Sequence, residues 1–342
     1  MIIYKMSSVI NQGAYGCILK PGIKCDGTKA LEGYISKIQK KKPRTDNEPI
    51  IGKILREKVP QFDRYFAPAL EVCPANLSMV KKNEIEKCKV YKNNKDNEEF
   101  VSIKIKYLGE KTLGDYLDIH YQNSPKTFIS HVKDNYTYLV DAIKELIRLE
   151  IVHNDLKLNN VMYSDKDKLP IIIDFGMAYQ MKDVLHNEKL QTIFFTENFE
   201  EMLVNIVKYP PWCIQKLYIA SIVRHEGWET KHVNIDSLKQ ITKTFLGENP
   251  IMALLKLYDS ISGQKHKLLQ KHSNQLNKKI DEFYGKQGKT VVNTLKQTWK
   301  TWDMYSLDVM YFMVMMDLVN SKYKTEEWTQ FTYTLAQNLI RD

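Results

Sequence analysis

The feature that most constrains the fold of this chain is a pair of short polar motifs separated by an apolar strand. Residues 151–160 have the sequence IVHNDLKLNN, and Asp174-Phe175-Gly176 begins fourteen residues after Asn160. Between them, Pro170 to Ile173 is the apolar, β-branched run that is typical of a buried strand. Because both motifs fall at strand–turn boundaries, they predict one functional site built on loops of a folded scaffold.

The apolar pattern changes along the chain. In the first hundred residues it consists of short β-branched and aromatic runs between Gly, Pro, Asn and Lys clusters, which predicts strands. One helix is expected within them, at residues 49–58, where apolar residues recur at helical spacing before Pro60. From Thr112 onward the pattern is mainly helical. We therefore expect an α+β fold with a β-rich lobe at residues 1–108 and a helical lobe at residues 109–342.

Composition narrows the class of protein. The longest apolar stretch, Met310 to Val319, is interrupted by Asp317 and is too short to cross a bilayer. The first residues, Met1 to Lys5, do not begin a signal peptide. We therefore expect a soluble, cytoplasmic protein without a membrane span. The cysteines lack metal-ligand spacing, and an odd, scattered set favours reduced thiols over a disulfide framework. These five cysteines are Cys17, Cys25, Cys73, Cys88 and Cys213.

The polar motifs contain the groups that phosphoryl transfer requires. Asp155 can orient or deprotonate an attacking hydroxyl, and Lys157 can reach a transferring phosphate. Asn160 and Asp174 offer the hard oxygen ligands that Mg²⁺ prefers. Gly176 is expected to let the backbone turn sharply after the metal ligand.

Together these motifs resemble the catalytic loop, H-R-D-L-x-x-x-N, and the D-F-G motif of eukaryotic protein kinases. The N-terminal residues 10–18, INQGAYGCI, resemble the kinase glycine-rich loop. The resemblance implies that Gly13 and Gly16 let backbone N–H groups approach the phosphates, that Tyr15 caps the loop tip, and that Ile18 borders the nucleotide. It also implies a bilobal kinase fold that binds ATP with Mg²⁺, or with Mn²⁺ in its place.

The same resemblance implies further nucleotide-binding residues. Residues 34–37, YISK, are similar to the kinase strand whose lysine holds the α- and β-phosphates, here Lys37. Its expected partner is a glutamate of the first helix: Glu48 is preferred, and Glu57 is the alternative. Residues 100–117 resemble a hinge and the helix after it, with Ile105 as gatekeeper and residues from Lys106 to Leu108 offering backbone hydrogen bonds to adenine.

Three departures from the family pattern concern regulation. Asn154 replaces the arginine that pairs with a phosphorylated activation loop, which suggests activity without that switch. Residues 209–212, YPPW, stand where A-P-E would close the activation segment. Asp303 begins a D-x-W-S-L-like motif, whose aspartate braces the catalytic loop, but about ninety residues, roughly 213–300, intervene as a helical insertion.

The insertion is basic. Between residues 256 and 300 ten lysines stand against three acidic residues, a local excess of seven positive charges. This excess suggests docking of an acidic partner or nucleic acid, although solvated helices that replace C-lobe packing are the favoured explanation. The combination of these departures is similar to the serine/threonine kinases of large nucleocytoplasmic DNA viruses, which would place the chain in the host cytoplasm or the virion.

Three functions are compatible with the motifs. The leading one is an ATP-dependent serine/threonine protein kinase that phosphorylates hydroxyls of a protein substrate, because Lys157 in D-L-K-x-x-N is typical of that class. A small-molecule phosphotransferase of kinase-like fold ranks second, since such enzymes usually lack D-F-G and D-x-W-S-L. A catalytically weak nucleotide-binding scaffold ranks third, because Lys37, Asp155, Asn160 and Asp174 are all retained.

Overall fold

The computed structural model describes most of the chain and divides it into two compact units. Unit 1 comprises residues 1–113 and 160–178, and unit 2 comprises residues 114–159 and 179–342. Unit 1 therefore adds the segment that contains Asp174 to the N-terminal residues, whereas the lobe boundary at residue 108 stays a prediction. The described residues are 6–13, 16–26, 30–41, 47–78, 80–93, 99–182, 207–263, 267–321 and 324–341.

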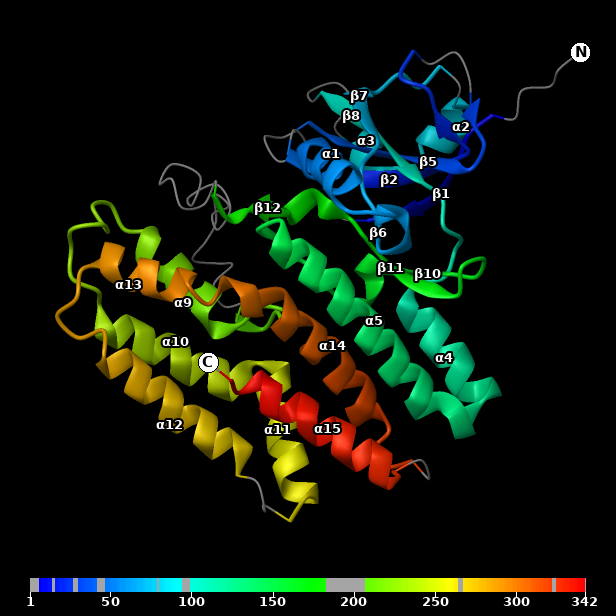
Figure 1. The fold of residues 1–342 in the computed structure, drawn as a ribbon. Helices are drawn as coiled ribbons and strands as arrows, with labels where there is room; N and C mark the ends of the chain where they lie inside the picture. The colour runs from blue at the N-terminus through cyan, green and yellow to red at the C-terminus, as the bar shows by residue number, and fades with distance from the viewer. Residues whose placement is uncertain are drawn as a thin grey trace, which may run out of the picture. The chain divides into compact units, whose positions relative to one another are not determined.

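Unit 1 is built on an antiparallel five-stranded sheet in the order β1-β2-β5-β8-β7 (Figure 1). A second sheet has the order β10-β11-β6, and β3 pairs with β4. The strands are β1 (Ser8–Gln12), β2 (Gly16–Lys20), β3 (Gly22–Ile23), β4 (Ala30–Leu31), β5 (Tyr34–Lys40), β6 (Phe66–Ala67), β7 (Glu71–Pro74), β8 (Phe100–Lys106), β10 (Val161–Ser164) and β11 (Leu169–Ile173). The helices are α1 (Asn47–Lys58), α2 (Lys82–Ile85) and α3 (Lys89–Lys92).

The helix α1 is positioned by close packing rather than by a broad apolar face. It buries Ile51 and Leu55, but Ile50, part of the predicted apolar stripe, is 55% exposed. Gly52 allows the close approach, because a Cβ at this position would lie 2.3 Å from the carbonyl oxygen of Ala69. This approach also buries Glu48, in the first turn of the helix.

Two disulfides in unit 1 contradict the prediction of reduced thiols. Cys17 bonds to Cys88, and Cys25 bonds to Cys73. Both bridges join residues more than 45 positions apart, so the partners come together only in the folded unit. Cys213, in unit 2, is a buried free thiol. The argument from reduced thiols to a cytoplasmic location is therefore lost, and the cytoplasmic location stays a prediction.

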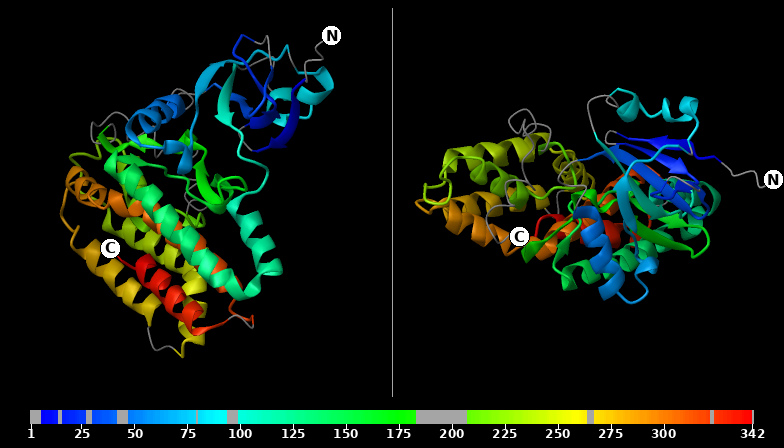
Figure 2. Two further views of the ribbon diagram at one scale, coloured as in Figure 1. Left: turned by 45° about the vertical axis from the view of Figure 1, so that its right-hand side comes forward. Right: turned by 90° about the horizontal axis from the view of Figure 1, so that it is seen from above.

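Unit 2 is mainly helical (Figures 1 and 2). A two-stranded ladder of β9 (Ile151–Val152) and β12 (Tyr179–Gln180) accompanies the helices. The helices are α4 (Leu113–Asn123), α5 (Phe128–Arg148), α9 (Ile214–Val223), α10 (Ile235–Glu248), α11 (Pro250–Ile261), α12 (Leu268–Asp281), α13 (Gly288–Lys296), α14 (Trp302–Asp317) and α15 (Glu326–Leu339).

The helix α14 is the core of unit 2. Twelve of its sixteen residues are buried, as expected of a helix that is apolar on every side. It packs against α5, α11 and α15, which run alongside it in Figures 1 and 2. Its apolar stretch was the longest in the sequence, and burial inside a helical unit accounts for that composition.

The predicted insertion forms the five helices from α9 to α13, and several have clear start signals. The Asn234 side chain accepts the backbone N–H of Ser237 at the start of α10, and Asn249 caps α11 directly before Pro250. The helices pack on one another, and α11 contacts α14. One of the counted lysines, Lys296, is buried in α13. Docking of an acidic partner or nucleic acid here stays a prediction.

The predicted α+β class is confirmed, with a β-rich first part and a helical remainder. Within the described ranges, no helix has both the length and the apolar character needed to cross a membrane.

The Cys25–Cys73 bridge gives a testable expectation. Replacing both cysteines by serine removes a cross-link between residues 48 positions apart, which should lower the free energy of unfolding of unit 1 by about 2–4 kcal/mol. Urea unfolding under non-reducing conditions measures the loss, and reduced wild type with its thiols blocked is the control. Alkylation of Cys25 and Cys73 in the native, unreduced chain would contradict the bridge.

Candidate active site

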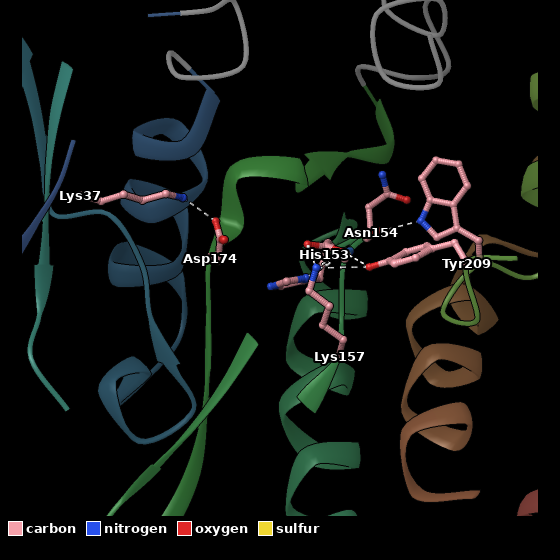
Figure 3. Close-up of polar contacts among 8 residues, drawn as sticks. Lys37, His153, Asn154, Lys157, Asp174 and Tyr209 are labelled. Carbon is pink, nitrogen blue, oxygen red and sulfur yellow. Dashed lines mark hydrogen bonds and ion pairs between the residues drawn. The ribbon is translucent and has the colours of Figure 1, made fainter. Parts of the chain in front are cut away.

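A charged cluster in unit 1, the Lys37 group, consists of Lys37, Glu48 and Asp174. Lys37 lies on β5, and its Nζ is 2.7 Å from Asp174 Oδ1 and 3.9 Å from Glu48 Oε2 (Figure 3). The first contact is a charge-assisted hydrogen bond, and the second is a longer ion pair. Strand β5 and the turn after β11 thus bring together two of the predicted site residues that are 137 positions apart.

Glu48, rather than the alternative Glu57, is the glutamate beside Lys37. Glu57 instead lies 3.8 Å from Lys53 on the exposed side of α1. The Glu48 side chain is only 1% exposed, and among the described residues its Oε2 has no hydrogen-bond partner. Burial therefore raises the pKa of Glu48 from 4.5 to about 6, although Lys37 acts in the opposite direction and Asp174 adds to the rise.

The turn that carries Asp174 is fixed by its neighbours. Asp174 has a left-handed backbone conformation, with φ of 61°, and Phe175 is fully buried edge-on against Phe66. Gly176 has a different role from the predicted one, because its φ is not positive. A Cβ on Gly176 would lie 3.3 Å from Asp174 Oδ1 and 3.5 Å from Glu48 Oε2, so glycine keeps room beside the carboxylates.

Asp174 and Asn160 carry side-chain oxygens of the type that Mg²⁺ takes as ligands. The Asp174 side chain is 39% exposed, so its carboxylate stays accessible beside Lys37. Asn160 ends a 3₁₀ turn directly before β10 and supplies an amide oxygen in the same unit. One carboxylate and one amide are few ligands for a cation alone, but Mg²⁺ commonly completes such a set with phosphate oxygens and water.

The glycine-rich segment forms the turn between β1 and β2. The Gly13 N–H donates to the carbonyl of Gly16 at 2.9 Å, and a Cβ on Gly13 would meet nothing within 4 Å. Gly16 is needed for packing, because a Cβ there would lie 2.2 Å from the carbonyl oxygen of Ile38. Ile18 is half-buried on β2. Tyr15 lies outside the described residues.

The predicted hinge residues lie at the end of β8. Ile105 is buried in an apolar cluster that also contacts Leu108. Lys106 pairs with Tyr34 in the ladder, and its side chain reaches Asp63 at 3.2 Å. The Tyr107 N–H already donates to the carbonyl of Gly33, so this amide is engaged within the protein.

The catalytic loop of unit 2 is held by a single carboxylate. The buried Asp303 accepts the backbone N–H of His153 at 2.6 Å and that of Asn154 at 3.1 Å. Asp303 lies in the first turn of α14, as the D-x-W-S-L resemblance implied for a residue that braces the loop. Charged acceptors make the strongest hydrogen bonds to backbone N–H groups, so this pair fixes the loop on the core helix.

Asn154, which replaces the usual arginine, links the loop to the turn before α9 and to α9 itself. It is 1% exposed and has a left-handed φ of 67°, a conformation that asparagine tolerates better than most residues. Its backbone carbonyl accepts the indole N–H of Trp212 at 2.9 Å, and its Oδ1 accepts Lys216 Nζ at 2.9 Å. Lys216 is completely buried between Trp212 and Trp302, at 5.6 and 5.5 Å from the ring centroids.

Asp155 lies in a three-residue cluster. Lys157 Nζ is 3.1 and 3.0 Å from its two carboxylate oxygens and 3.4 Å from the hydroxyl of Tyr209 (Figure 3). The Tyr209 hydroxyl also donates a short hydrogen bond to Asp155 Oδ1. The Asp155 side chain is 14% exposed, and that of Lys157 is 39% exposed. The carboxylate of Asp155, the ammonium group of Lys157 and the hydroxyl of Tyr209 are thus in mutual contact.

Two residues of this region were missed as site residues. Tyr209 was noted only as part of YPPW, and Lys216 was not considered. A signal for Lys216 existed, since it is the one charged residue of α9, IQKLYIASIV, a helix whose other residues are almost all buried. Burial lowers the pKa of Lys216, and the nearby Cys213, Asp303 and Asp155 act in the opposite direction. No sequence signal locates the Tyr209 contact.

Parts of the chain are similar to known proteins. The family model of the protein kinase domain matches residues 30–202, about half of the 342-residue chain. The chain is 37% identical over 57 residues to a probable inactive serine/threonine-protein kinase, samkD, of Dictyostelium discoideum. These 57 residues are 16% of this chain and 10% of that protein. The solved structure of the Cydia pomonella granulovirus kinase PK-1 has a TM-score of 0.35 and 19% identity, over 52% of this chain and 55% of that one.

The chain belongs to the protein kinase family. The family prediction made from the catalytic loop is confirmed. The chain spans a tenth of the curated relative and about half of the solved one.

The buried Glu48 predicts a pH dependence of stability. Its pKa of about 6 lies above the ordinary 4.5, so the folded state holds the proton more tightly than the unfolded state. Stability from this group is complete below pH 4.5 and is lost, by about 2 kcal/mol, as the pH rises through 6. Glu48→Gln should remove this slope and be more stable than wild type above pH 6. Urea unfolding at a series of pH values measures it.

The control for this measurement is Glu57→Gln, which changes an exposed glutamate of the same helix. It should leave the pH slope as in wild type. If the free energy of unfolding changed with pH in the same way for Glu48→Gln and wild type, the burial argument would be contradicted.

The Lys216–Asn154 contact predicts a strong coupling. Double-mutant cycles with Lys216→Met and Asn154→Ala should give a coupling free energy of about 1.5–3 kcal/mol, because a charged donor meets a buried amide. A matched cycle on the exposed Lys239–Asp281 pair, 3.1 Å apart, should give about 0.2–1 kcal/mol. Chemical unfolding of the variants measures both, and equal couplings would count against a special role for Lys216.

Proposed function

We propose that this protein is an ATP-dependent serine/threonine protein kinase that transfers the γ-phosphate of Mg-ATP to hydroxyl groups of a protein substrate. The observation that carries the proposal is the Asp155 carboxylate, held beside Lys157 on a loop that Asp303 fixes to the core helix. A base on a rigid loop meets the first need of phosphoryl transfer, which is positioning of the acceptor.

In this proposal the residues of unit 2 act on the acceptor. Asp155 accepts the hydrogen bond of the incoming hydroxyl and takes its proton as the bond to phosphorus forms. Lys157, which contacts both oxygens of Asp155, offsets negative charge on the transferring phosphoryl group. The fixed geometry of Asn154 keeps the next residue, Asp155, oriented before any acceptor arrives.

The residues of unit 1 act on the nucleotide. Lys37 exchanges part of its contact with Asp174 for the phosphates, and Glu48 keeps the ammonium group directed. Asn160 and Asp174 would hold the cation. Mg²⁺, when bound with ATP, neutralises charge on the β- and γ-phosphates. Ile105 and Leu108 belong to an apolar cluster that suits an adenine ring, and the backbone from Lys106 to Leu108 remains the proposed adenine contact.

The acceptor class rests on the loop sequence D-L-K-x-x-N, which the chain shares with serine/threonine-directed kinases. Membership of the protein kinase family supports a protein rather than a small molecule as acceptor. A cytoplasmic or virion location belongs to the same proposal.

A second candidate is a nucleotide-binding scaffold with little transfer activity. The observation that favours it is the Tyr209 hydroxyl on Asp155, because an external acceptor must displace this phenol to reach the base. All four of Lys37, Asp155, Asn160 and Asp174 are nevertheless present, and that favours the enzyme.

The proposal predicts the effect of Asp155→Asn. This change keeps the shape of the side chain but removes the base, so transfer of the γ-phosphate to a generic serine/threonine substrate should fall by at least about 100-fold. An assay with labelled Mg-ATP and phosphosite mapping measures both the rate and the residue class. Binding of ATP by both proteins with no transfer by either would favour the scaffold. Full transfer by Asp155→Asn would overturn the mechanism.

A further inference from the structure

A cavity in unit 2, the α9–α10 cavity, is lined by none of the residues that the proposed mechanism uses. It has a volume of about 240 Å³. Its walls are the end of α9, the turn at residues 225–233, the first turn of α10, and Gly288 at the start of α13. Helix α9 packs against both α10 and α13, which lie beside it in Figure 1. The cavity therefore belongs to the helical insertion.

The walls of the α9–α10 cavity are held by backbone contacts. The Lys231 N–H donates to the carbonyl of Gly227 at 3.1 Å, and the Gly288 N–H donates to the carbonyl of Lys231 at 2.9 Å. Gly288 allows this approach, because a Cβ there would lie 2.2 Å from the carbonyl oxygen of Trp228. The cavity is thus built into the packing of the turn on α13, and preformed cavities of this kind are typical of ligand sites.

The polar side chains of the cavity can all donate hydrogen bonds. They are one ammonium group, two imidazoles, two hydroxyls and an amide, from Lys231, His225, His232, Ser221, Ser237 and Asn234. Among the described residues that line the cavity, none is acidic, and this holds even for the acidic residues nearest in sequence, Glu226, Glu229 and Asp236. A concave site with a cation and several donors but no carboxylate favours an anion.

The hydroxyl of Ser221 adds a buried donor to this set. Ser221 is 2% exposed, and its hydroxyl oxygen is 3.5 Å from that of Ser237. Hydrogen bonds between oxygens are normally 2.5–3.0 Å long, so this contact is weak. A ligand oxygen that accepts from both hydroxyls would satisfy them better than they satisfy each other.

The remaining walls are apolar. Ile222, Trp228 and Leu238 are 6%, 6% and 1% exposed, and Val233 completes the set. A carbon group in the cavity would pack on these side chains while its anionic end meets the donors. Sites for drug-sized ligands usually have about 300–1,000 Å³, so the smaller cavity suits one side chain or a small molecule rather than a nucleotide.

We propose that the α9–α10 cavity binds a phosphomonoester with a small apolar body, such as a phenyl ring. The phosphate oxygens lie among Lys231, the imidazoles and the serine hydroxyls, and the ring packs on Trp228 and Leu238. A phosphomonoester has three terminal oxygens that accept hydrogen bonds, whereas a carboxylate has two, so the phosphate engages more of these donors. Its source is either a free small molecule or a phosphorylated side chain of a protein, because both present the same group.

The test is isothermal titration calorimetry of the full chain with phenyl phosphate, in the absence of ATP. Wild type should bind it with a Kd of about 0.1–1 mM. Lys231→Met should weaken this binding about tenfold, because the ammonium group is lost. Lys243→Met removes the same charge from an exposed position of α10 outside the cavity, and as the matched control it should leave the Kd unchanged. Urea unfolding checks that both variants are folded.

Further ligands test the two parts of the phosphomonoester. Inorganic phosphate lacks the apolar body and benzoate lacks the phosphate, so each should bind about tenfold more weakly than phenyl phosphate. Binding of either as tight as that of phenyl phosphate would overturn the assignment. A short alanine peptide with one phosphotyrosine separates the sources. Tighter binding than phenyl phosphate supports a phosphorylated side chain, and equal or weaker binding supports a free small molecule.

The result is independent of the proposed kinase function, because no transfer is measured. Equal Kd values for wild type and Lys231→Met would overturn the inference. Loss of binding in Lys37→Met but not in Lys231→Met would place the phosphate at the proposed nucleotide site and would also overturn it. In either case the kinase proposal would stand.

Discussion

The carboxylate of Asp303 is the constraint on which the loop of residues 153–160 in unit 2 depends. Buried backbone N–H groups need acceptors, and Asp303 supplies both oxygens to two consecutive ones, those of His153 and Asn154. Because Asp303 belongs to a helix in which twelve of sixteen residues are buried, the loop is anchored to the core of unit 2. The same helix also holds the turn before α9 through Ser306, so the base and its surroundings share one support.

Asn154 shows how the chain manages without the usual arginine. An arginine at this position waits for a phosphate from the activation loop, whereas Asn154 accepts a hydrogen bond from a lysine that is permanently present. Burying Lys216 is unfavourable, as its lowered pKa indicates, but two indole faces and an amide oxygen offset part of that penalty. The loop is thus ordered by internal packing.

Sequence reasoning was strongest where the signal was local. The catalytic loop, Lys37, the choice of Glu48 over Glu57 and the bracing position of Asp303 follow from short motifs whose spacing is set by strands and helices. It failed where no motif marked the two partners. Cys17 and Cys88 are 71 positions apart and follow no spacing rule, and the Lys216–Asn154 contact spans 62. Position 16 is a third case, because only glycine leaves room there for the carbonyl oxygen of Ile38 on the neighbouring strand.

The insertion between the activation segment and α14 also has a consequence for how the protein is made. His153 and Asp303 are 150 positions apart, and five helices lie between Cys213 and the brace. During synthesis the catalytic loop emerges long before the residue that fixes it, so it stays without its acceptors until those helices have been made. Such long-range closure slows folding and prolongs exposure of apolar surface. The backbone N–H groups of His153 and Asn154 therefore obtain their acceptor only once α14 has been made and packed.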